Sequence, residues 1–310
     1  MARPVASVST ATLPPAPLWQ TSRFLLDLTQ PQVMGIVNVT PDSFSDGGQH
    51  AGTRAALQHC EQLLKEGAHI LDIGGESSRP GAAPLPLQEE LARVLPVVQG
   101  AVTLGVPVSV DTYKPEVMQA ALDAGADIIN DIWALRYHSA MGAPVAQPSA
   151  YEVVASYPHC GLVLMHMHRN PQTMQSAPMD CDDVVTQVAA DLLSFCELLP
   201  QYSKGLEQKN AYKTRIVLDP GVGFGKTVAQ NFSLLARQAE LLSLGYPLLA
   251  GWSRKSSLGA VTGLEPADRM LPSVAAALLA VQRGASIVRV HDVRETVQAL
   301  QVWRAVQTSV

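Results

Sequence analysis

The sequence predicts a single (β/α)8 barrel with an N-terminal extension. From residue 33 onward, eight short β-rich runs alternate with longer helical patterns, which implies parallel strands joined by helical crossovers. The expected strands are apolar at nearly every position, as is typical when both faces of a sheet are covered. Polar residues collect at the carboxyl ends of many strands, where a barrel places its site. An open doubly wound sheet, the alternative fold, would concentrate them at one switch point.

The elements follow one another in a regular order. Helical patterns occupy stretches such as 53–67, 115–125 and 268–284, and each closes on a glycine, the usual left-handed helix stop. The expected strands lie at residues 33–39, 69–75, 107–111, 127–132, 161–166, 215–219, 248–253 and 286–291.

Two segments are expected along the chain. Residues 1–30 contain Pro14, Pro15 and Pro17 and no apolar core of a signal peptide, so we expect a flexible extension there. Residues 31–310 form the catalytic barrel, and no linker divides them.

Composition excludes several classes of protein. The 310 residues are 47% hydrophobic and 16% charged, too apolar for a disordered chain. A net charge of −5 argues against nucleic acid as a partner, because phosphate neutralisation needs a basic surface. The longest apolar run, 274–281, is too short to cross a membrane. The four cysteines form no C-x-x-C pair, which favours free thiols and a cytoplasmic location.

Six segments at strand ends carry the chemistry of the chain. They read GIVNVTPDSFSDGG, DIGGESSRPGA, SVDTYKP, LDPGVGFGK, SRKSSLG and RVHDV. In this order the set resembles the dihydropteroate synthases, and the match runs from about Val33 to the C-terminus. The resemblance implies that small molecules are the partners: 6-hydroxymethyl-7,8-dihydropterin pyrophosphate condenses with 4-aminobenzoate, with magnesium as cofactor. It also implies a homodimer and a target of sulfonamides, which compete with the aminobenzoate.

The resemblance assigns the pterin to residues whose chemistry fits its flat, guanidine-like edge. A carboxylate at Asp219 can accept two neighbouring N–H groups at once, and the amide of Asn130 suits a mixed donor and acceptor edge. Lys255 can donate to the ring carbonyl, and Asp111 can stabilise positive charge that develops on the bridging carbon. Met165 and Gly251 are expected to line the same pocket, and Asp46 joins Asp111 and Lys255 as a candidate catalytic residue.

A second set of residues is expected to bind the pyrophosphate and the aminobenzoate, which are both anions. Arg289 and His291 lie two apart on a strand, so they point the same way, and they resemble the pyrophosphate-binding pair of the family. Arg79 can add a forked donor, and Asn38 offers magnesium a hard oxygen ligand. The resemblance assigns the aminobenzoate to four further residues, which are Ser78, Pro80, Phe224 and Ser256.

The rival enzyme class is a methyltetrahydrofolate-dependent methyltransferase, which shares the barrel and a similar pterin pocket. Such an enzyme would not need the SRKS segment, the Arg289–His291 pair or the ESSRPG loop. The sequence also departs from the family at Ser78, at Met167-His168-Arg169 and at Trp252. None of these departures removes an expected catalytic group.

Overall fold

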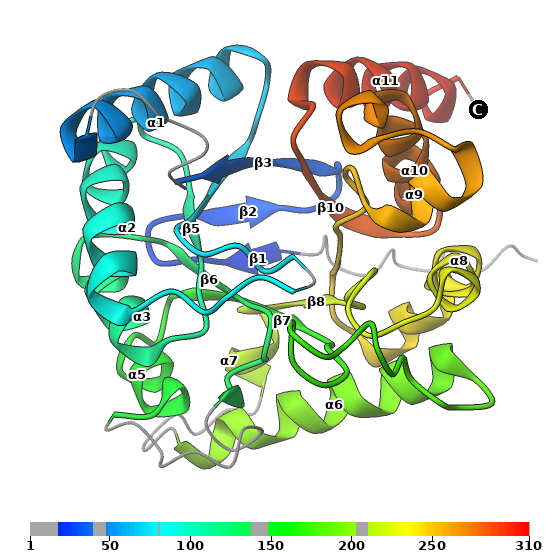
Figure 1. The fold of residues 1–310 in the computed structure, drawn as a ribbon, viewed down its shortest axis with the longest axis horizontal. Coiled ribbons are helices and arrows are strands. Elements are labelled where there is room, and N and C mark those ends of the chain that lie inside the picture. The colour runs from blue at the N-terminus through cyan, green and yellow to red at the C-terminus, as the bar shows by residue number, and fades with distance from the viewer. Residues whose placement is uncertain (1–17, 40–47, 80, 138–147, 203–209, 310) are drawn as a thin grey trace, which may run out of the picture.

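The computed structural model describes residues 18–39, 48–79, 81–137, 148–202 and 210–309. Eight parallel strands close into a barrel in the order β10-β3-β4-β5-β6-β7-β8-β9, and helices surround it (Figure 1). The (β/α)8 class expected from the sequence is therefore confirmed. The barrel strands are β3 (Gln32–Asn38), β4 (Ile70–Gly74), β5 (Val108–Asp111), β6 (Ile128–Asp131), β7 (Gly161–Met165), β8 (Ile216–Asp219), β9 (Leu248–Ala250) and β10 (Ala285–Val290).

The helices form where the sequence shows a period of 3.6 residues, and their apolar sides pack on the outside of the barrel. They are α1 (Gly48–Lys65), α2 (Leu87–Val102), α3 (Pro115–Asp123), α5 (Ala150–Ser156), α6 (Val184–Tyr202), α7 (Asn210–Lys213), α8 (Val228–Ala236), α9 (Ser256–Thr262), α10 (Met270–Gln282) and α11 (Val293–Gln307). Short 3-10 helices occupy Gln238–Leu244 and Pro266–Asp268. Among the helices in the described ranges, none is long and apolar enough to span a bilayer.

A hairpin closes the barrel at the amino ends of its strands. Strands β1 (Leu18–Gln20) and β2 (Leu25–Asp27) pair antiparallel. Trp19 is fully buried in a cluster with one apolar side chain from most barrel strands, and its Nε1 donates to the carbonyl of Arg215 at 2.7 Å. The Arg23 guanidinium bonds the fully buried carboxylate of Asp127 at 2.6 and 2.9 Å.

This hairpin corrects the expectation of a flexible extension over residues 1–30. Within this stretch, Trp19, Leu26 and Leu28 pack against the amino ends of the barrel strands. Two strands of three residues each carry too few positions for an alternating pattern to be visible. Residues 1–17 lie outside the described ranges.

We predict that Trp19→Ala destabilises the protein by about 3–5 kcal/mol, because it empties a fully buried indole site beneath the barrel. Urea unfolding followed by circular dichroism measures this change. The neighbouring Leu18→Ala is the matched control, because Leu18 is 43% exposed. Equal effects of the two substitutions would contradict the stabilising role of the buried Trp19 beneath the barrel.

Candidate active site

The parallel register brings the predicted site residues to one rim of the barrel. Asn38 pairs with Gly74, Gly74 with Asp111, and Asp111 with Asn130, so the carboxyl-terminal parts of four strands, β3 to β6, stand side by side. Further round, Asp219 ends β8 and pairs with Met165 of β7. These are the carboxyl ends of the strands, where barrel enzymes carry their sites.

Arg289 organises the middle of this rim. Its Nε bonds Asp72 Oδ2 at 2.6 Å and its Nη2 bonds Asp111 Oδ2 at 2.7 Å. The amide nitrogen of Asn130 also lies 3.2 Å from Asp72, which leaves the Asn130 oxygen available to accept a hydrogen bond. Burial raises the pKa of Asp111 above its usual range, although Arg289 opposes that shift. The carboxylate of Asp111 is thus desolvated and held by a single guanidinium.

Asp72 is a site residue that the analysis of the sequence missed. It is fully buried on β4 and holds both Asn130 and Arg289 in place. A signal was available, since a charged residue stands inside the apolar strand ILDIG, and buried charges are nearly always paired.

Asp219 and Lys255 lie on the opposite side of the mouth. Asp219 Oδ1 accepts the backbone N–H of Gly221 at 2.7 Å, and its Oδ2 lies 3.8 Å from the Cβ position of Gly251. Burial raises the pKa of Asp219, while the Gly221 N–H and Lys255 act against that shift. The ammonium of Lys255 sits 4.2 Å from the centre of the Phe224 ring, and burial lowers the pKa of Lys255 to about 8.

The loop after β8 is held from within by a second lysine. Lys226 is buried, and its Nζ donates to the carbonyls of Gly221 at 2.8 Å, Phe224 at 3.1 Å and His166 at 3.3 Å. Three donors meet three acceptors, so the buried ammonium is satisfied without a carboxylate partner. Burial lowers the pKa of Lys226 to about 7. This lysine therefore fixes the Phe224 backbone.

Gly221 is required by the same loop. It has φ +67°, and a Cβ there would stand 1.8 Å from the His166 carbonyl oxygen. Only glycine allows the loops after β7 and β8 to approach this closely. Phe224 packs in the resulting contact with Met165, Met167 and Tyr113, and this apolar wall agrees with the expected placement of Met165.

His291 is oriented by Ser253, another residue without an expected role. Ser253 Oγ accepts the backbone N–H of His291 at 3.1 Å and lies 2.9 Å from its Nδ1. If the hydroxyl proton goes to Nδ1, the neutral ring carries its own proton on Nε2, which then faces outward as a donor. Burial lowers the pKa of His291 to about 3, and Arg289, Arg254 and Arg79 act in the same direction. His291 is therefore a neutral donor among arginines.

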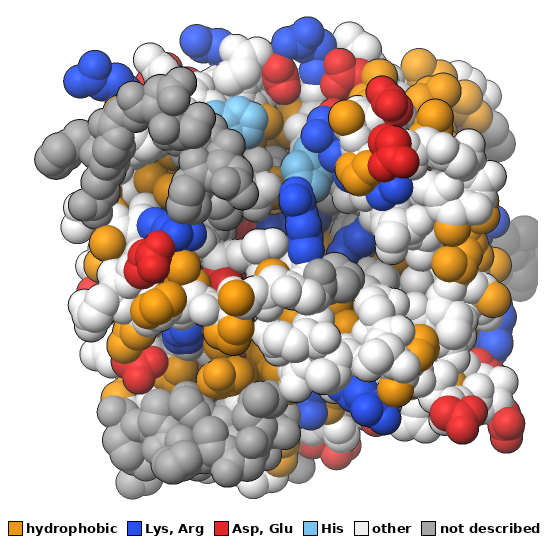
Figure 2. Space-filling view, viewed as in Figure 1, with side chains coloured by type: hydrophobic (Ala, Val, Ile, Leu, Met, Phe, Trp, Pro, Cys, Tyr) orange, Lys and Arg blue, Asp and Glu red, His pale blue; other side chains and the backbone are white. Residues whose placement is uncertain are grey.

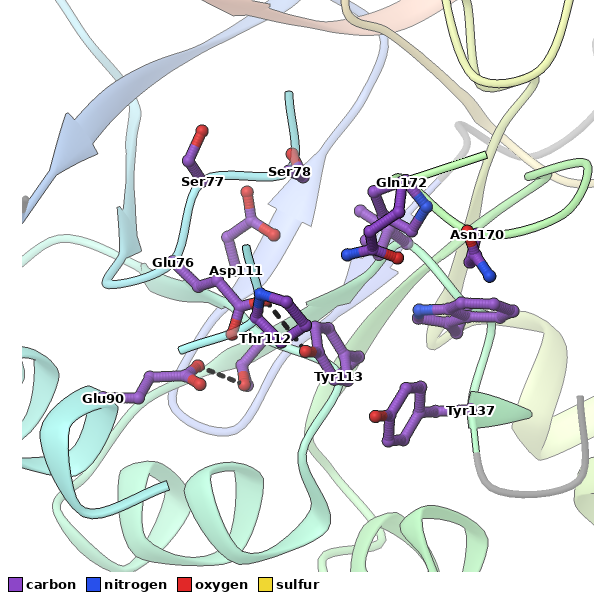
Figure 3. A pocket seen from close by; sticks show the side chains of 14 residues that line it. Glu76, Ser77, Ser78, Glu90, Asp111, Thr112, Tyr113, Tyr137, Asn170 and Gln172 are labelled. Atoms are coloured by element: carbon purple, nitrogen blue, oxygen red, sulfur yellow. Dashed lines mark hydrogen bonds between the residues drawn. The ribbon is translucent and has the colours of Figure 1, made fainter. Parts of the chain in front are cut away.

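A pocket opens beside Asp111, between the loop that follows β4 and the ends of β5, β6 and β7. Its lining includes Ser78 and the aromatic side chains of Tyr113, Trp133 and Tyr137 (Figure 3). The loop after β4 crosses to the loop after β7, where the Gly81 N–H donates to the Pro171 carbonyl at 3.1 Å. Arg79 is exposed on this loop, and among the described residues its guanidinium has no partner. On the face shown in Figure 2, Lys, Arg and His side chains gather around the centre.

Of the remaining residues expected in the site, the structure describes Ser256 but not Asp46 or Pro80. Ser256 begins α9 and is exposed, as expected for a residue that opens a helix. Two other features belong to the core: Trp252 is buried against Phe232, and His166 Nε2 lies 3.1 Å from Asp191.

Comparisons with known proteins identify the family of this chain. Residues 34–291 match the family described as pterin binding enzyme. Dihydropteroate synthase of Escherichia coli (strain K12) is 47% identical over 90% of this chain and 93% of its own length. That of Neisseria meningitidis serogroup B is 47% identical over 93% of this chain and 97% of its own length.

Solved structures give the same result. Xanthomonas albilineans dihydropteroate synthase with 4-aminobenzoic acid superposes with a TM-score of 0.82 at 48% identity, covering 94% of this chain and 98% of that one. The Burkholderia cenocepacia enzyme complexed with 7,8-dihydropteroate gives 0.81 at 47% identity, covering 95% and 98%. Because the family model matches residues 34–291 and these relatives and solved structures cover nine-tenths or more of the chain, it belongs to the dihydropteroate synthase family.

Proposed function

We propose a role for each residue of the rim in the dihydropteroate synthase reaction. As a member of this family the chain is a transferase that joins 6-hydroxymethyl-7,8-dihydropterin pyrophosphate to 4-aminobenzoate and releases pyrophosphate. The observation that carries the assignment is the gathering of Asp111, Asn130 and Asp219, at the carboxyl-terminal parts of three strands, with Lys255, which precedes α9, at one barrel mouth.

The pterin ring binds inside the mouth. Asp219 Oδ2 accepts hydrogen bonds from the guanidine-like edge, since its Oδ1 already holds the Gly221 N–H. The side-chain nitrogen of Asn130 already donates to Asp72, so its side-chain oxygen accepts a hydrogen bond from the pterin. Lys255 donates to the ring carbonyl. Met165 supplies an apolar surface beside the ring, and Gly251, which has no side chain, leaves space for the ring next to Asp219.

The pyrophosphate binds between Arg79, Arg289 and His291. Arg289 has five N–H donors and uses two of them for Asp72 and Asp111, so three remain for the anion. His291 adds a neutral donor, and the unpaired guanidinium of Arg79 adds a fork from the loop.

Asn38 is the residue that would hold a magnesium ion beside this anion. Among the described residues, no group of three His, Cys, Asp or Glu side chains could hold a metal. The oxygen of Asn38, at the end of β3, fits an ion that keeps several waters and takes most other ligands from phosphate. Such an ion would neutralise charge on the leaving group.

The aminobenzoate binds where the loops approach Lys255. Phe224 offers its ring beneath the Lys255 ammonium, and Ser78 and Ser256 offer hydroxyls. Pro80 remains assigned to the same subsite. In the Xanthomonas albilineans and Yersinia pestis relatives, bound 4-aminobenzoic acid and a sulfonamide drug support such a subsite.

The chemistry exchanges one bond for another. The bond from the pterin methylene to the pyrophosphate oxygen breaks, and its electron pair leaves with pyrophosphate. The amine nitrogen then bonds the methylene and loses one proton. Asp111 offsets the positive charge on the methylene, and Asp46 remains a candidate for handling the proton.

A homodimer and a cytoplasmic location complete the proposal. Exposed apolar side chains on α9, α10 and α11 support a second copy as the partner, among them Val261, Leu271 and Val302 at 60, 72 and 68% exposure. Four free cysteines support a reducing compartment.

The activity is tested by pyrophosphate release with both substrates and magnesium. We expect release that requires 4-aminobenzoate and a product with the mass of dihydropteroate. A methyltransferase-like barrel would release no pyrophosphate, so absence of release would reject the proposed reaction.

We predict that Asp219→Asn weakens binding of the pterin pyrophosphate by about 1–3 kcal/mol, because an NH2 then opposes a buried substrate N–H. Calorimetry measures the affinity of the wild type and the variant. Aminobenzoate, titrated with pyrophosphate and magnesium present, serves as the control ligand and should bind unchanged. Equal pterin affinities would show that Asp219 is not the anchor.

We predict that kcat/KM falls as the pH rises through about 8, because Lys255 must keep its proton to donate and burial lowers its pKa to about 8. Initial rates between pH 6.5 and 10, values chosen to bracket this pKa, test it. Lys255→Arg should move the alkaline limb upward, since a guanidinium keeps its proton far above this range. An alkaline limb that stays in place in this variant would assign the titration to another group.

A further inference from the structure

One side of the pocket of Figure 3 is formed by a largely buried charge cluster that no assigned role explains. Lys114 contacts a carboxylate oxygen of Glu76 and one of Glu90. The other oxygen of Glu76 accepts from the Tyr113 hydroxyl at 2.8 Å, and that of Glu90 accepts from Thr112 Oγ1 at 2.7 Å. All four carboxylate oxygens of Glu76 and Glu90 thus have a hydrogen-bond donor. These bonds replace the water that Glu90, which is only 1% exposed, cannot reach.

The cluster joins the strand of Asp111 to the loop after β4. Thr112, Tyr113 and Lys114 follow Asp111 directly, whereas Glu76 stands two residues before Ser78 and three before Arg79. Two residues span at most about 7 Å, so a displacement of Glu76 is passed on to Ser78. The position of the loop relative to Asp111 therefore depends on Glu76.

The rest of the loop is held at few points. Gly75 is fixed from α2, where Arg93 Nη1 donates to its carbonyl at 3.0 Å. At the far end, Gln172 Nε2 donates to the Ala82 carbonyl at 3.0 Å. Between these ends, Ser77 and Arg79 are exposed. Glu76 is thus the last anchored side chain before the residues assigned to substrate.

Lys114 is the group that allows Glu76 to stay there. Two carboxylates share one ammonium, so removing the ammonium leaves two like charges close together in a poorly hydrated place. Burial acts to lower the pKa of Lys114, but its bonds to the two carboxylates raise the pKa overall. The lysine stays charged, and without it Glu76, at the more exposed end, would turn toward solvent.

We propose that Lys114 is a positioning residue for the transferase: by bridging Glu76 and Glu90 it holds the loop that carries Ser78 and Arg79 over the aminobenzoate and pyrophosphate subsites. This inference rests on the roles proposed above for Ser78 and Arg79. Lys114 itself is bonded to the two glutamates and acts through Glu76.

The first test is Lys114→Met, which keeps the length of the side chain and removes its charge. We expect the KM for aminobenzoate to rise on the order of 10- to 100-fold, as for other small misplacements of substrate-positioning groups. The affinity for 6-hydroxymethylpterin, which has no pyrophosphate, should stay within about twofold of the wild type, since the strands that bind the ring are untouched.

Two further variants separate positioning from simple loss of structure. Lys114→Arg should restore the KM, because a guanidinium can also bridge two carboxylates. Glu76→Gln keeps the shape of the side chain and weakens the bridge, so it should raise the aminobenzoate KM in the same selective way even if Lys114→Met does not fold. Arg294→Met, which breaks the surface ion pair with Glu66, is the matched control and should change neither value.

The proposal is overturned if Lys114→Met or Glu76→Gln leaves the aminobenzoate KM unchanged. It is also overturned if pterin and aminobenzoate affinities fall together, since that pattern indicates general loss of structure. Formation of dihydropteroate by the wild type tests the reaction itself, so failure of the positioning role and failure of the proposed function are distinguishable.

Discussion

The mouth of the barrel depends on the guanidinium of Arg289. It bonds Asp72, which is fully buried, and Asp111, whose carboxylate is desolvated. A buried carboxylate without a partner is strongly destabilising, so this arginine stabilises both aspartates at their strand positions, together with the Asn130 amide that also contacts Asp72. These pairs join residues 217 and 178 positions apart, and they form only when β10 closes the barrel against β3. Closure of the sheet and assembly of the site are therefore the same event.

The side chains at the mouth of the barrel stand either on rigid strands or on loops. Asp111, Asn130 and Asp219 end barrel strands, and hydrogen bonds in the sheet fix their backbones. The groups assigned to the aminobenzoate and pyrophosphate stand largely on loops. Each loop is held by a neighbouring polar group: Lys226 for the one after β8, Ser253 for His291, and the Glu76–Lys114 bridge for the one after β4. In the proposed assignment, groups on the strands thus bind the pterin ring, whereas groups largely on loops bind the pyrophosphate and the aminobenzoate.

Sequence patterns predicted the barrel and the placement of the rim residues, because parallel strands bring their carboxyl ends to one edge whatever the details of packing. They did not predict the supporting contacts. The partners of Asp72 and Ser253, and the His166 carbonyl that Lys226 contacts, come from other segments of the chain, and only the closed barrel brings them together. The sequence patterns did not predict the hairpin at residues 18–27 for another reason: it is stabilised by the packing of Trp19 beneath the barrel, and no local sequence pattern reveals that contact. Asp46 and Pro80 stay predictions.

Arg289 also connects the two charges that the proposed reaction creates. As the bond to the leaving oxygen breaks, negative charge grows on pyrophosphate, which in the proposed arrangement faces the donors of this guanidinium that Asp72 and Asp111 do not use. Positive charge grows on the methylene, which Asp111 offsets from the other end of the same ion pair. Both charges develop against partners that the fold has already fixed, so little reorganisation is needed. Burial strengthens the effect, since the desolvated Asp111 anion attracts a cation more strongly than a hydrated one does.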